Sequence, residues 1–132
     1  MTDTVTGRGL ILGKTNVLFE RGTGVSIRSG NYTKAACRAV EDALWHHSIN
    51  VAEVFGTSKE NMLIDVEIAC QNPTELDLVQ VRDIFPYGQV DVSAVAGGLD
   101  IVNPHYQNGQ KTVIAHAAIK ISLNLVKREA AV

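Results

Sequence analysis

A glycine-rich stretch between a strand-like run and the only long helical pattern constrains the fold of this chain most. The apolar run 16–19 leads into residues 21–31, which contain Gly22, Gly24 and Gly30. A helical pattern follows at once, because apolar residues between 32 and 47 recur every three or four positions. The sequence therefore predicts a strand, a loop rich in glycine and then a helix, in that order.

The segments that follow alternate between the period of a strand and the period of a second helix. Three segments place apolar side chains at every second position and are predicted to be strands: 62–70, 89–97 and 111–123. Residues 76–85 predict a short second helix, which Pro86 would end. Residues 16–21 complete the set as the first strand.

These elements predict one domain of the α/β (α+β) class with the order β-α-β-α-β-β. The domain is expected at 15–124, between tails at 1–14 and 125–132. Only a loop joins 89–97 to 111–123, so these strands are predicted to pair as an antiparallel hairpin. The first two strands enclose a helix, which predicts a β-α-β crossover. The expected result is a four-stranded mixed sheet with both helices on one face.

Two helices can cover only one face of such a sheet, and the residues predicted for the other face are mixed in character. Alternation places Asp65, Glu67, Asp91, His116 and Lys120 there, beside apolar side chains. One interpretation is a solvated face with cross-strand ion pairs, and the other is an interface with a second copy of the chain. The second interpretation predicts a homo-oligomer.

Charge and composition argue against several classes of partner. The net charge is −2 and the only basic cluster is Lys127-Arg128, so neither nucleic acid nor an anionic membrane is expected as a partner. No apolar run approaches the ~20 residues of a membrane span, and the first residues lack the pattern of a secretion signal. Cys37 and Cys70 lie in apolar segments and are expected to be reduced thiols. A cytoplasmic location is therefore expected.

Nucleotide-binding motifs fail at single positions of the sequence. Residues 13–15 resemble the end of a phosphate-binding loop, but that loop needs glycine where this chain has Arg8. Gly22 and Gly24 lack the third glycine of a dinucleotide fingerprint, because Ile27 occupies its position. The histidines and cysteines do not show the spacing of metal ligands. No cofactor and no metal are therefore expected.

The glycine loop and the helix start form the strongest candidate site for a small-molecule ligand. Backbone N–H groups at a helix N-terminus stabilise an anion or a developing oxyanion, and glycines let a ligand approach the backbone. Ser26 and Lys34 are predicted to act as nucleophile and base. The predicted substrate-binding residues are Gly22, Gly24, Arg28, Asn31, Thr33, Arg38, Gly97, Gly98 and His105. The alternative is an ordinary tight turn followed by a helix cap.

Beyond these local features, residues 17–123 resemble the Lin-type conserved hypothetical proteins of bacteria. The resemblance is carried by the glycine loop and the segments that follow it, namely Tyr32-Thr33-Lys34-Ala35-Ala36, Arg38-Ala39-Val40, Phe85-Pro86-Tyr87-Gly88 and Gly97-Gly98-Leu99. It implies the fold of that family and no particular reaction. More distantly, a β-α-β unit with a serine, a lysine and paired glycines is similar to one repeat of the ring-opening amidohydrolases, cyanuric acid hydrolase and barbiturase. That second resemblance implies cleavage of a cyclic amide at a site between similar domains, which a single-domain chain would form as a homo-oligomer, a trimer or larger.

Two functions follow as hypotheses. The first is a small-molecule enzyme with its site between subunits, which hydrolyses a cyclic amide or a related C–N bond through Ser26 and Lys34. The second is a non-catalytic oligomeric protein that binds a metabolite or acts as a scaffold. Both predict the same assembly, and they differ in whether polar groups converge at the junction between subunits.

Overall fold

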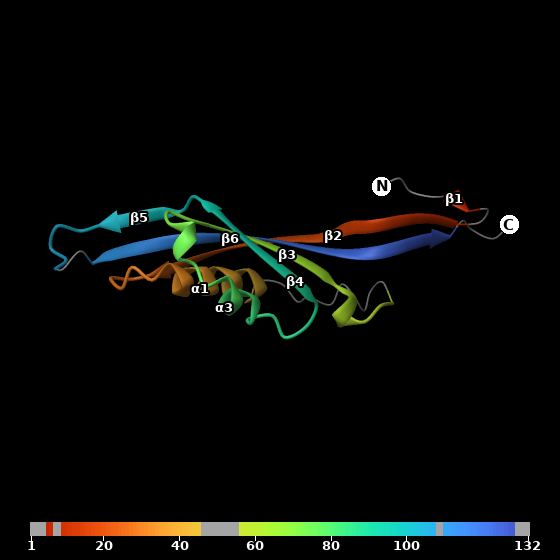
Figure 1. Cartoon of the computed structure of the whole chain (residues 1–132), viewed down its shortest axis with the longest axis horizontal. Coiled ribbons are helices and arrows are strands. Elements are labelled where there is room, and N and C mark those ends of the chain that lie inside the picture. The colour runs from red at the N-terminus through yellow and green to blue at the C-terminus, as the bar shows by residue number, and fades with distance from the viewer. Residues whose placement is uncertain (1–4, 7–8, 46–55, 108–109, 129–132) are drawn as a thin grey trace.

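The computed structural model describes residues 5–6, 9–45, 56–107 and 110–128. Its mixed sheet contains, in spatial order, β1 (Val5–Thr6), β2 (Gly9–Ser26), β6 (Lys111–Arg128), β3 (Leu63–Cys70) and β4 (Gln89–Ala96). Strand β5 (Leu99–Val102) pairs with β6 beyond the end of β3. Figure 1 shows that β2 and β6 run along the long axis of the molecule.

Two helices cover one face of this sheet. Figure 1 shows α1 (Tyr32–Trp45) and α3 (Leu78–Arg82) on the same side of it. Short 3₁₀ turns precede β3 at Lys59–Asn61 and α3 at Pro73–Glu75. No helix in the described part of the chain is long and apolar enough to cross a membrane. The predicted class, mixed sheet and one-sided helix layer are confirmed, but the sheet has six strands and not four.

Small residues let α1 approach the sheet closely. Ala35, Ala39 and Ala43 lie along one side of α1 and are fully buried. Gly22 and Gly24 of β2 face them, and a Cβ atom added to Gly24 would lie 2.0 Å from the carbonyl oxygen of Ala35. Both glycines therefore belong to a strand and not to the predicted loop. Glycine is required here because any larger residue would collide with the backbone of the helix.

The pairing of the last strands differs from the predicted hairpin. β4 pairs with β3 in parallel, and β6 lies between β2 and β3, antiparallel to both. Gly97 and Gly98 carry the chain past the end of β3, where a Cβ atom added to Gly98 would lie 2.2 Å from the carbonyl oxygen of Ile114. β5 then forms the antiparallel hairpin with β6. A strand as short as β5 shows too little alternation to be recognised in a sequence.

Several element boundaries also differ from the prediction. Both long strands extend into the segments predicted as tails, because β2 and β6 pair from the first residue of one to the last residue of the other. The second helix is shorter than residues 76–85, since Asp77 caps it by accepting hydrogen bonds from the backbone N–H groups of Val79 and Gln80. The predicted end of the first helix at 47 lies outside the described residues.

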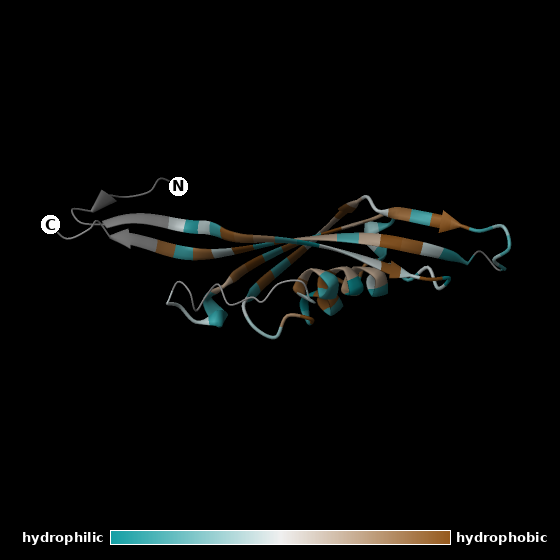
Figure 2. Cartoon of the chain, turned by 180° about the vertical axis from the view of Figure 1, so that it is seen from behind, coloured by the Kyte–Doolittle hydropathy of each residue, from teal (hydrophilic) through white to brown (hydrophobic). Residues whose placement is uncertain are grey.

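No helix of the described chain covers the other face of the sheet. Val95, Leu99 and Ile101 are 41%, 54% and 43% exposed and lie at positions whose register partners point to this face. Figure 2 shows β5 as hydrophobic apart from one hydrophilic position. That position is Asp100, which points to the opposite face, where α1 lies. An uncovered face with apolar and charged side chains is therefore present, as the alternation of the sequence predicted.

Candidate functional site

A hollow on the uncovered face of the sheet gathers polar side chains from four elements. Arg21 and Thr23 of β2, Asp42 of α1, Glu67 of β3 and His116 of β6 line it. Its volume is about 570 Å³, within the roughly 300–1,000 Å³ that is usual for small-molecule sites. We call this region the sheet-face hollow.

The register of the strands explains why these residues meet. Thr23 is the partner of His116 across β2 and β6, and Ala69 of β3 is the partner of the same histidine from its other side. Glu67 precedes Ala69 by two positions, so it points to the same face and is the diagonal neighbour of His116. Arg21 precedes Thr23 in the same way. Three adjacent strands thus present a guanidinium, an imidazole and a carboxylate on one surface.

Two hydrogen bonds hold the β2 side of the sheet-face hollow. The backbone N–H of Thr23 donates to Oδ2 of Asp42 over 2.9 Å, so this hydrogen bond joins α1 to the edge of β2. The side-chain Oγ1 of Thr23 lies 3.1 Å from Nδ1 of His116. Among the described residues, this contact engages Nδ1 of His116 and leaves Nε2 as the other ring nitrogen.

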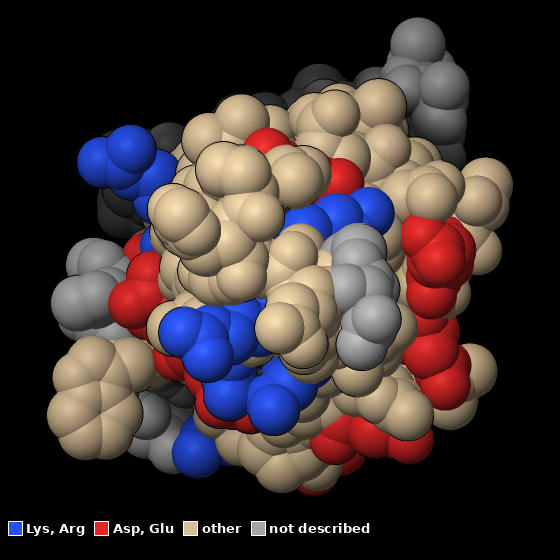
Figure 3. Space-filling view, turned by 90° about the vertical axis from the view of Figure 1, so that its left-hand side faces the viewer, with Lys and Arg blue, Asp and Glu red and all other residues tan. Residues whose placement is uncertain are grey.

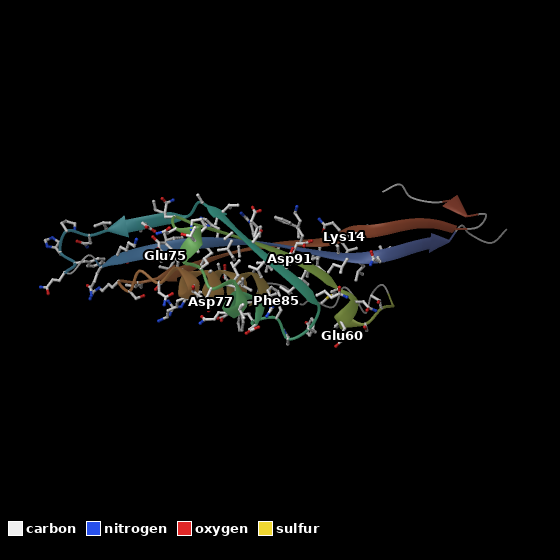
Figure 4. All side chains as sticks on the ribbon, viewed as in Figure 1. Lys14, Glu60, Glu75, Asp77, Phe85 and Asp91 are labelled. Carbon is white, nitrogen blue, oxygen red and sulfur yellow. The ribbon has the colours of Figure 1, made fainter. Side chains whose placement is uncertain are left out.

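A smaller recess of about 150 Å³ shares Glu67 with the sheet-face hollow. Asp65 and Asp91 line this recess and are direct neighbours in the register of β3 and β4 (Figure 4 labels Asp91 and Lys14). Two carboxylates so close to each other repel. Lys14 offsets the repulsion through an ion pair of 2.8 Å with Asp65, and Lys120 is the register partner of Asp65 on β6. The β3–β4 side of the face nevertheless stays the more acidic side.

The predicted loop–helix junction lies away from the sheet-face hollow, beside the start of β6. Arg28 has a φ of 66° and lies at the centre of a tight turn that a 2.8 Å hydrogen bond between its two neighbours closes. The backbone N–H of Gly30 donates to the carbonyl of Lys111 over 3.1 Å. Asn31 caps α1, because its Oδ1 accepts a 3.0 Å hydrogen bond from the backbone N–H of Lys34. The turn and the cap are thus both present at this junction.

Tyr32, Asp100 and Lys111 form a polar cluster behind the loop, which the sequence did not reveal. The hydroxyl of Tyr32 donates to Oδ2 of Asp100 over 2.5 Å and accepts from Nζ of Lys111 over 2.7 Å. Nζ of Lys111 also lies 3.2 Å from Oδ2 of Asp100. Among the described residues, the buried Oδ1 of Asp100 has no hydrogen-bond partner. The cluster joins α1, β5 and β6, elements too far apart in the sequence for local spacing to connect them.

Burial and hydrogen bonds in this cluster stabilise the protonated forms of two side chains. Burial, followed by the hydrogen bond to Asp100, raises the pKa of Tyr32 above its ordinary value. The hydrogen bonds to Tyr32 and Asp100 raise the pKa of Lys111. A neutral tyrosine and a charged lysine are therefore the forms that hold this junction together near neutral pH.

Ser26 and Lys34, the predicted nucleophile and base, occupy different environments. Ser26 is the last residue of β2 and only 1% exposed, and its Oγ lies 2.5 Å from Oγ of Ser29. It points toward α1, like its buried register partner Val113. Lys34 is exposed in the first turn of α1. The hydrogen bonds of the described residues do not join the two side chains, so the pair stays a prediction.

Two of the predicted binding residues hold elements together. Arg38 donates from Nη1 to the carbonyl of Val25 over 2.6 Å and so ties α1 to the end of β2. Oγ1 of Thr33 accepts a 2.9 Å hydrogen bond from the backbone N–H of Asp77, next to the start of α3. These contacts give both residues a structural role, and their role in binding stays a prediction.

The remaining predicted residues lie near β5. The side-chain amide of Gln71 donates to the carbonyls of Gly97 and Gly98 over 3.0 Å and 3.2 Å. His105 is exposed in the loop after β5, and its backbone N–H donates to Oδ1 of Asn103 over 2.9 Å. Gly22 and Gly24 pack against α1 at some distance along β2, so the structure does not gather the predicted residues at one point.

Exposed Arg28 and half-buried Tyr106 form a pair at the end of the molecule. The guanidinium carbon of Arg28 lies 5.2 Å from the centre of the Tyr106 ring. Hydrogen bonds from Thr112 and Arg28 lower the pKa of Tyr106. Figure 3 views this end and shows Lys and Arg side chains gathered on it. The junction therefore presents a basic surface, while the sheet-face hollow presents both signs of charge.

The fold and the hollow define a class of protein: a small α+β domain whose mixed sheet has helices on one face and a polar hollow on the other. Within that class, the profile of the conserved hypothetical protein family Lin0512 matches residues 16–121. The chain therefore belongs to the Lin0512 family. The first of the two resemblances seen in the sequence is confirmed.

Similar structures add the extent of the shared fold. The chain is similar to an FtsZ-like protein of unknown function from Nostoc punctiforme, with 27% identity and a TM-score of 0.75. The match covers 86% of this chain and 98% of that one, so the two share nearly the whole domain. None of the curated proteins matches the chain significantly. Neither the family nor the similar structure links the chain to the ring-opening amidohydrolases.

Proposed function

We propose that this protein is a small-molecule enzyme whose active site is the sheet-face hollow. The observation that carries the proposal is the convergence of Arg21, Glu67 and His116, from three strands, on one hollow of suitable volume. Side chains stand perpendicular to a sheet, and the pairing of the strands determines which of them are neighbours. They therefore meet without the help of a flexible loop. By contrast, Ser26 is buried and paired with a second hydroxyl at the loop–helix junction.

The lining of the hollow fits a small ring that carries neighbouring C=O and N–H groups. Arg21 supplies N–H donors for a carbonyl oxygen, and Glu67 supplies acceptors for ring N–H groups. Cyclic amides have this pattern. In the reaction that we propose, His116 takes a proton from water as the water oxygen bonds to the carbonyl carbon. The ring C–N bond then breaks, and the nitrogen leaves with the proton.

We also propose that a second copy of the chain covers the sheet-face hollow. In one copy the hollow is open, because Arg21, Glu67 and His116 are all exposed, whereas enzymes exclude bulk water from their reacting groups. The uncovered face is acidic toward β4, where Asp91 lies, and carries Arg21 toward β2. A head-to-tail arrangement would place the acidic side of one copy on the basic side of the next. Head-to-tail contacts form a ring when their rotation closes, and the assembly that we propose is such a ring of three or more copies.

The assembly is tested by light scattering and sedimentation of the purified protein at micromolar concentration. We expect a mass of at least three chains for the wild type. Asp91→Lys reverses a charge on the uncovered face and is expected to shift the protein toward monomers. Asp83→Lys is the matched control, because Asp83 is exposed beside α3, on the helix side. A monomeric wild type would contradict the shared site.

The reaction is tested with barbiturate, cyanurate and hydantoin as probes. We expect the wild type to bind at least one of them in calorimetry and to open its ring, followed by the loss of ultraviolet absorbance. His116→Ala should lower kcat at least about 100-fold, the usual contribution of a general base. Glu67→Gln should weaken binding. Both variants change exposed residues, so the fold should be retained.

The other outcomes separate the competing hypotheses. Binding without ring opening would favour the non-catalytic, metabolite-binding protein. If Ser26→Ala or His105→Ala loses turnover while His116→Ala stays active, the active site lies at the loop–helix junction and not in the sheet-face hollow. A wild type that binds none of the three probes would contradict the proposed substrate class.

A further inference from the structure

We infer that Thr23 is a positioning residue for His116: its hydroxyl holds the imidazole in one orientation and one tautomer, with Nε2 toward the sheet-face hollow. This inference depends on the proposed function in one respect, namely the identity of the molecule on which His116 acts. The contact between Oγ1 of Thr23 and Nδ1 of His116, 3.1 Å long, belongs to the chain itself.

An exposed histidine on a sheet needs such a contact to keep a fixed direction. Its ring can rotate, and its proton can occupy either nitrogen, unless one nitrogen is engaged. For Nε2 to accept a proton, Nδ1 must carry the ring's proton, and Oγ1 of Thr23 accepts the hydrogen bond from Nδ1 in that tautomer. Threonine is also β-branched, which restricts its χ1 and limits the directions in which Oγ1 can point. Thr23 therefore offers a defined contact and not a mobile one.

The surroundings of Thr23 fix its backbone on both sides. Gly22 and Gly24 press against α1, where an added Cβ atom would lie 2.1 Å and 2.0 Å from carbonyl oxygens of the helix. Between them, the backbone N–H of Thr23 donates to Asp42 over 2.9 Å. A shift of β2 along or away from α1 would break these contacts together. The close packing of α1 on β2 thus sets where the hydroxyl that meets His116 lies.

The charged groups near the ring have a different effect. Glu67 of β3, Arg21 of β2 and Lys120 of β6 lie on the same face as His116, and Asp42 of α1 lines the same hollow. Their charges act over distance and do not fix the direction of the ring. A hydroxyl carries no charge, so its removal should alter ring orientation and tautomer with little change in the field. This difference makes the role of Thr23 measurable.

The first test is the ¹⁵N NMR spectrum of the His116 ring in the unliganded protein, at a pH where the imidazole is neutral. In the wild type we expect widely separated Nδ1 and Nε2 shifts, the sign of one tautomer. Thr23→Val keeps the shape of the side chain and removes the hydroxyl, so both shifts should move toward those of free histidine. Thr23→Ser should retain the wild-type shifts. His116→Ala assigns the signals among the four histidines of the chain.

The second test is the turnover of whichever probe the wild type opens. Thr23→Val should lower kcat about tenfold with little change in KM, because a freely rotating base is aligned less often. Thr23→Ser should recover most of the loss. Backbone amide spectra verify the fold, and Thr23→Ala replaces Thr23→Val if the valine variant does not fold.

The two tests separate this inference from the proposed function. Ring shifts that move in Thr23→Val, in a protein that opens no probe, would support the positioning role and contradict the proposed reaction. Ring shifts that stay at their wild-type values in Thr23→Val would overturn the positioning role, whatever the turnover.

Discussion

Gly24→Ala is expected to lower the free energy of unfolding by more than about 3 kcal/mol, at the upper end of overpacking effects. The added Cβ atom would lie 2.0 Å from the carbonyl oxygen of Ala35 and 2.3 Å from the backbone nitrogen of Ala39. Both atoms belong to the helix backbone, so no side-chain rotation can relieve the clash. The whole of α1 would have to move away from β2, and the buried alanine face would lose its contacts.

Urea denaturation followed by circular dichroism measures this loss. Gly56→Ala is the matched control, because Gly56 has a φ of +71° but no atom within 4 Å of an added Cβ. That control should cost about 1–2 kcal/mol through backbone conformation alone. If Gly24→Ala costs no more than Gly56→Ala, the close packing of α1 on β2 does not limit the stability of the fold.

Lys111→Met is expected to destabilise the protein by about 2 kcal/mol, below the 3–5 kcal/mol of a fully buried pair because both partners are partly exposed. The side chains of Lys111 and Asp100 are 32% and 22% exposed. Without the ammonium group, the carboxylate of Asp100 keeps one hydrogen bond, from Tyr32, and its buried Oδ1 keeps none among the described residues. An uncompensated charge in such a place is costly.

A double-mutant cycle tests this reading of the cluster. Asp100→Asn removes the uncompensated charge, so the double variant should recover part of the loss caused by Lys111→Met. Lys14→Met is the matched control, since Lys14 and Asp65 form an ion pair with side chains 53% and 39% exposed. An exposed pair of this kind contributes about 0–1 kcal/mol. Equal losses in Lys111→Met and Lys14→Met would contradict a special role for the cluster.

The sequence predicted the elements better than their pairing. The alternation in Leu63–Cys70 and Gln89–Ala96, and the helical period in Tyr32–Trp45, correspond to elements within a few residues of the predicted ranges. Pairing depends on contacts between distant segments, which carry no local period. β6 therefore enters between β2 and β3, and β4 joins β3 in parallel, although chain order favoured a hairpin.

The candidate site shows the same division. Alternation placed Glu67 and His116 on the uncovered face, yet nothing in their spacing joined them to Arg21, which lies almost a hundred residues before His116 in the chain. The glycines were read as signs of a ligand-binding loop, and Gly22 and Gly24 instead make room for a helix. A glycine that serves a ligand and a glycine that serves packing look alike in a sequence.

The sequence by itself determined that this chain forms an α+β domain with helices on one face of a mixed sheet. It also determined that the other face is uncovered and partly charged. Period and composition are local properties, and each segment carries them without its neighbours. Only the tertiary structure decided which charges meet on that face, because the register of β2, β6 and β3 sets the neighbours of His116. Register is fixed where one face is buried, here partly by α1 packed on Gly22 and Gly24, and these contacts join segments far apart in the chain.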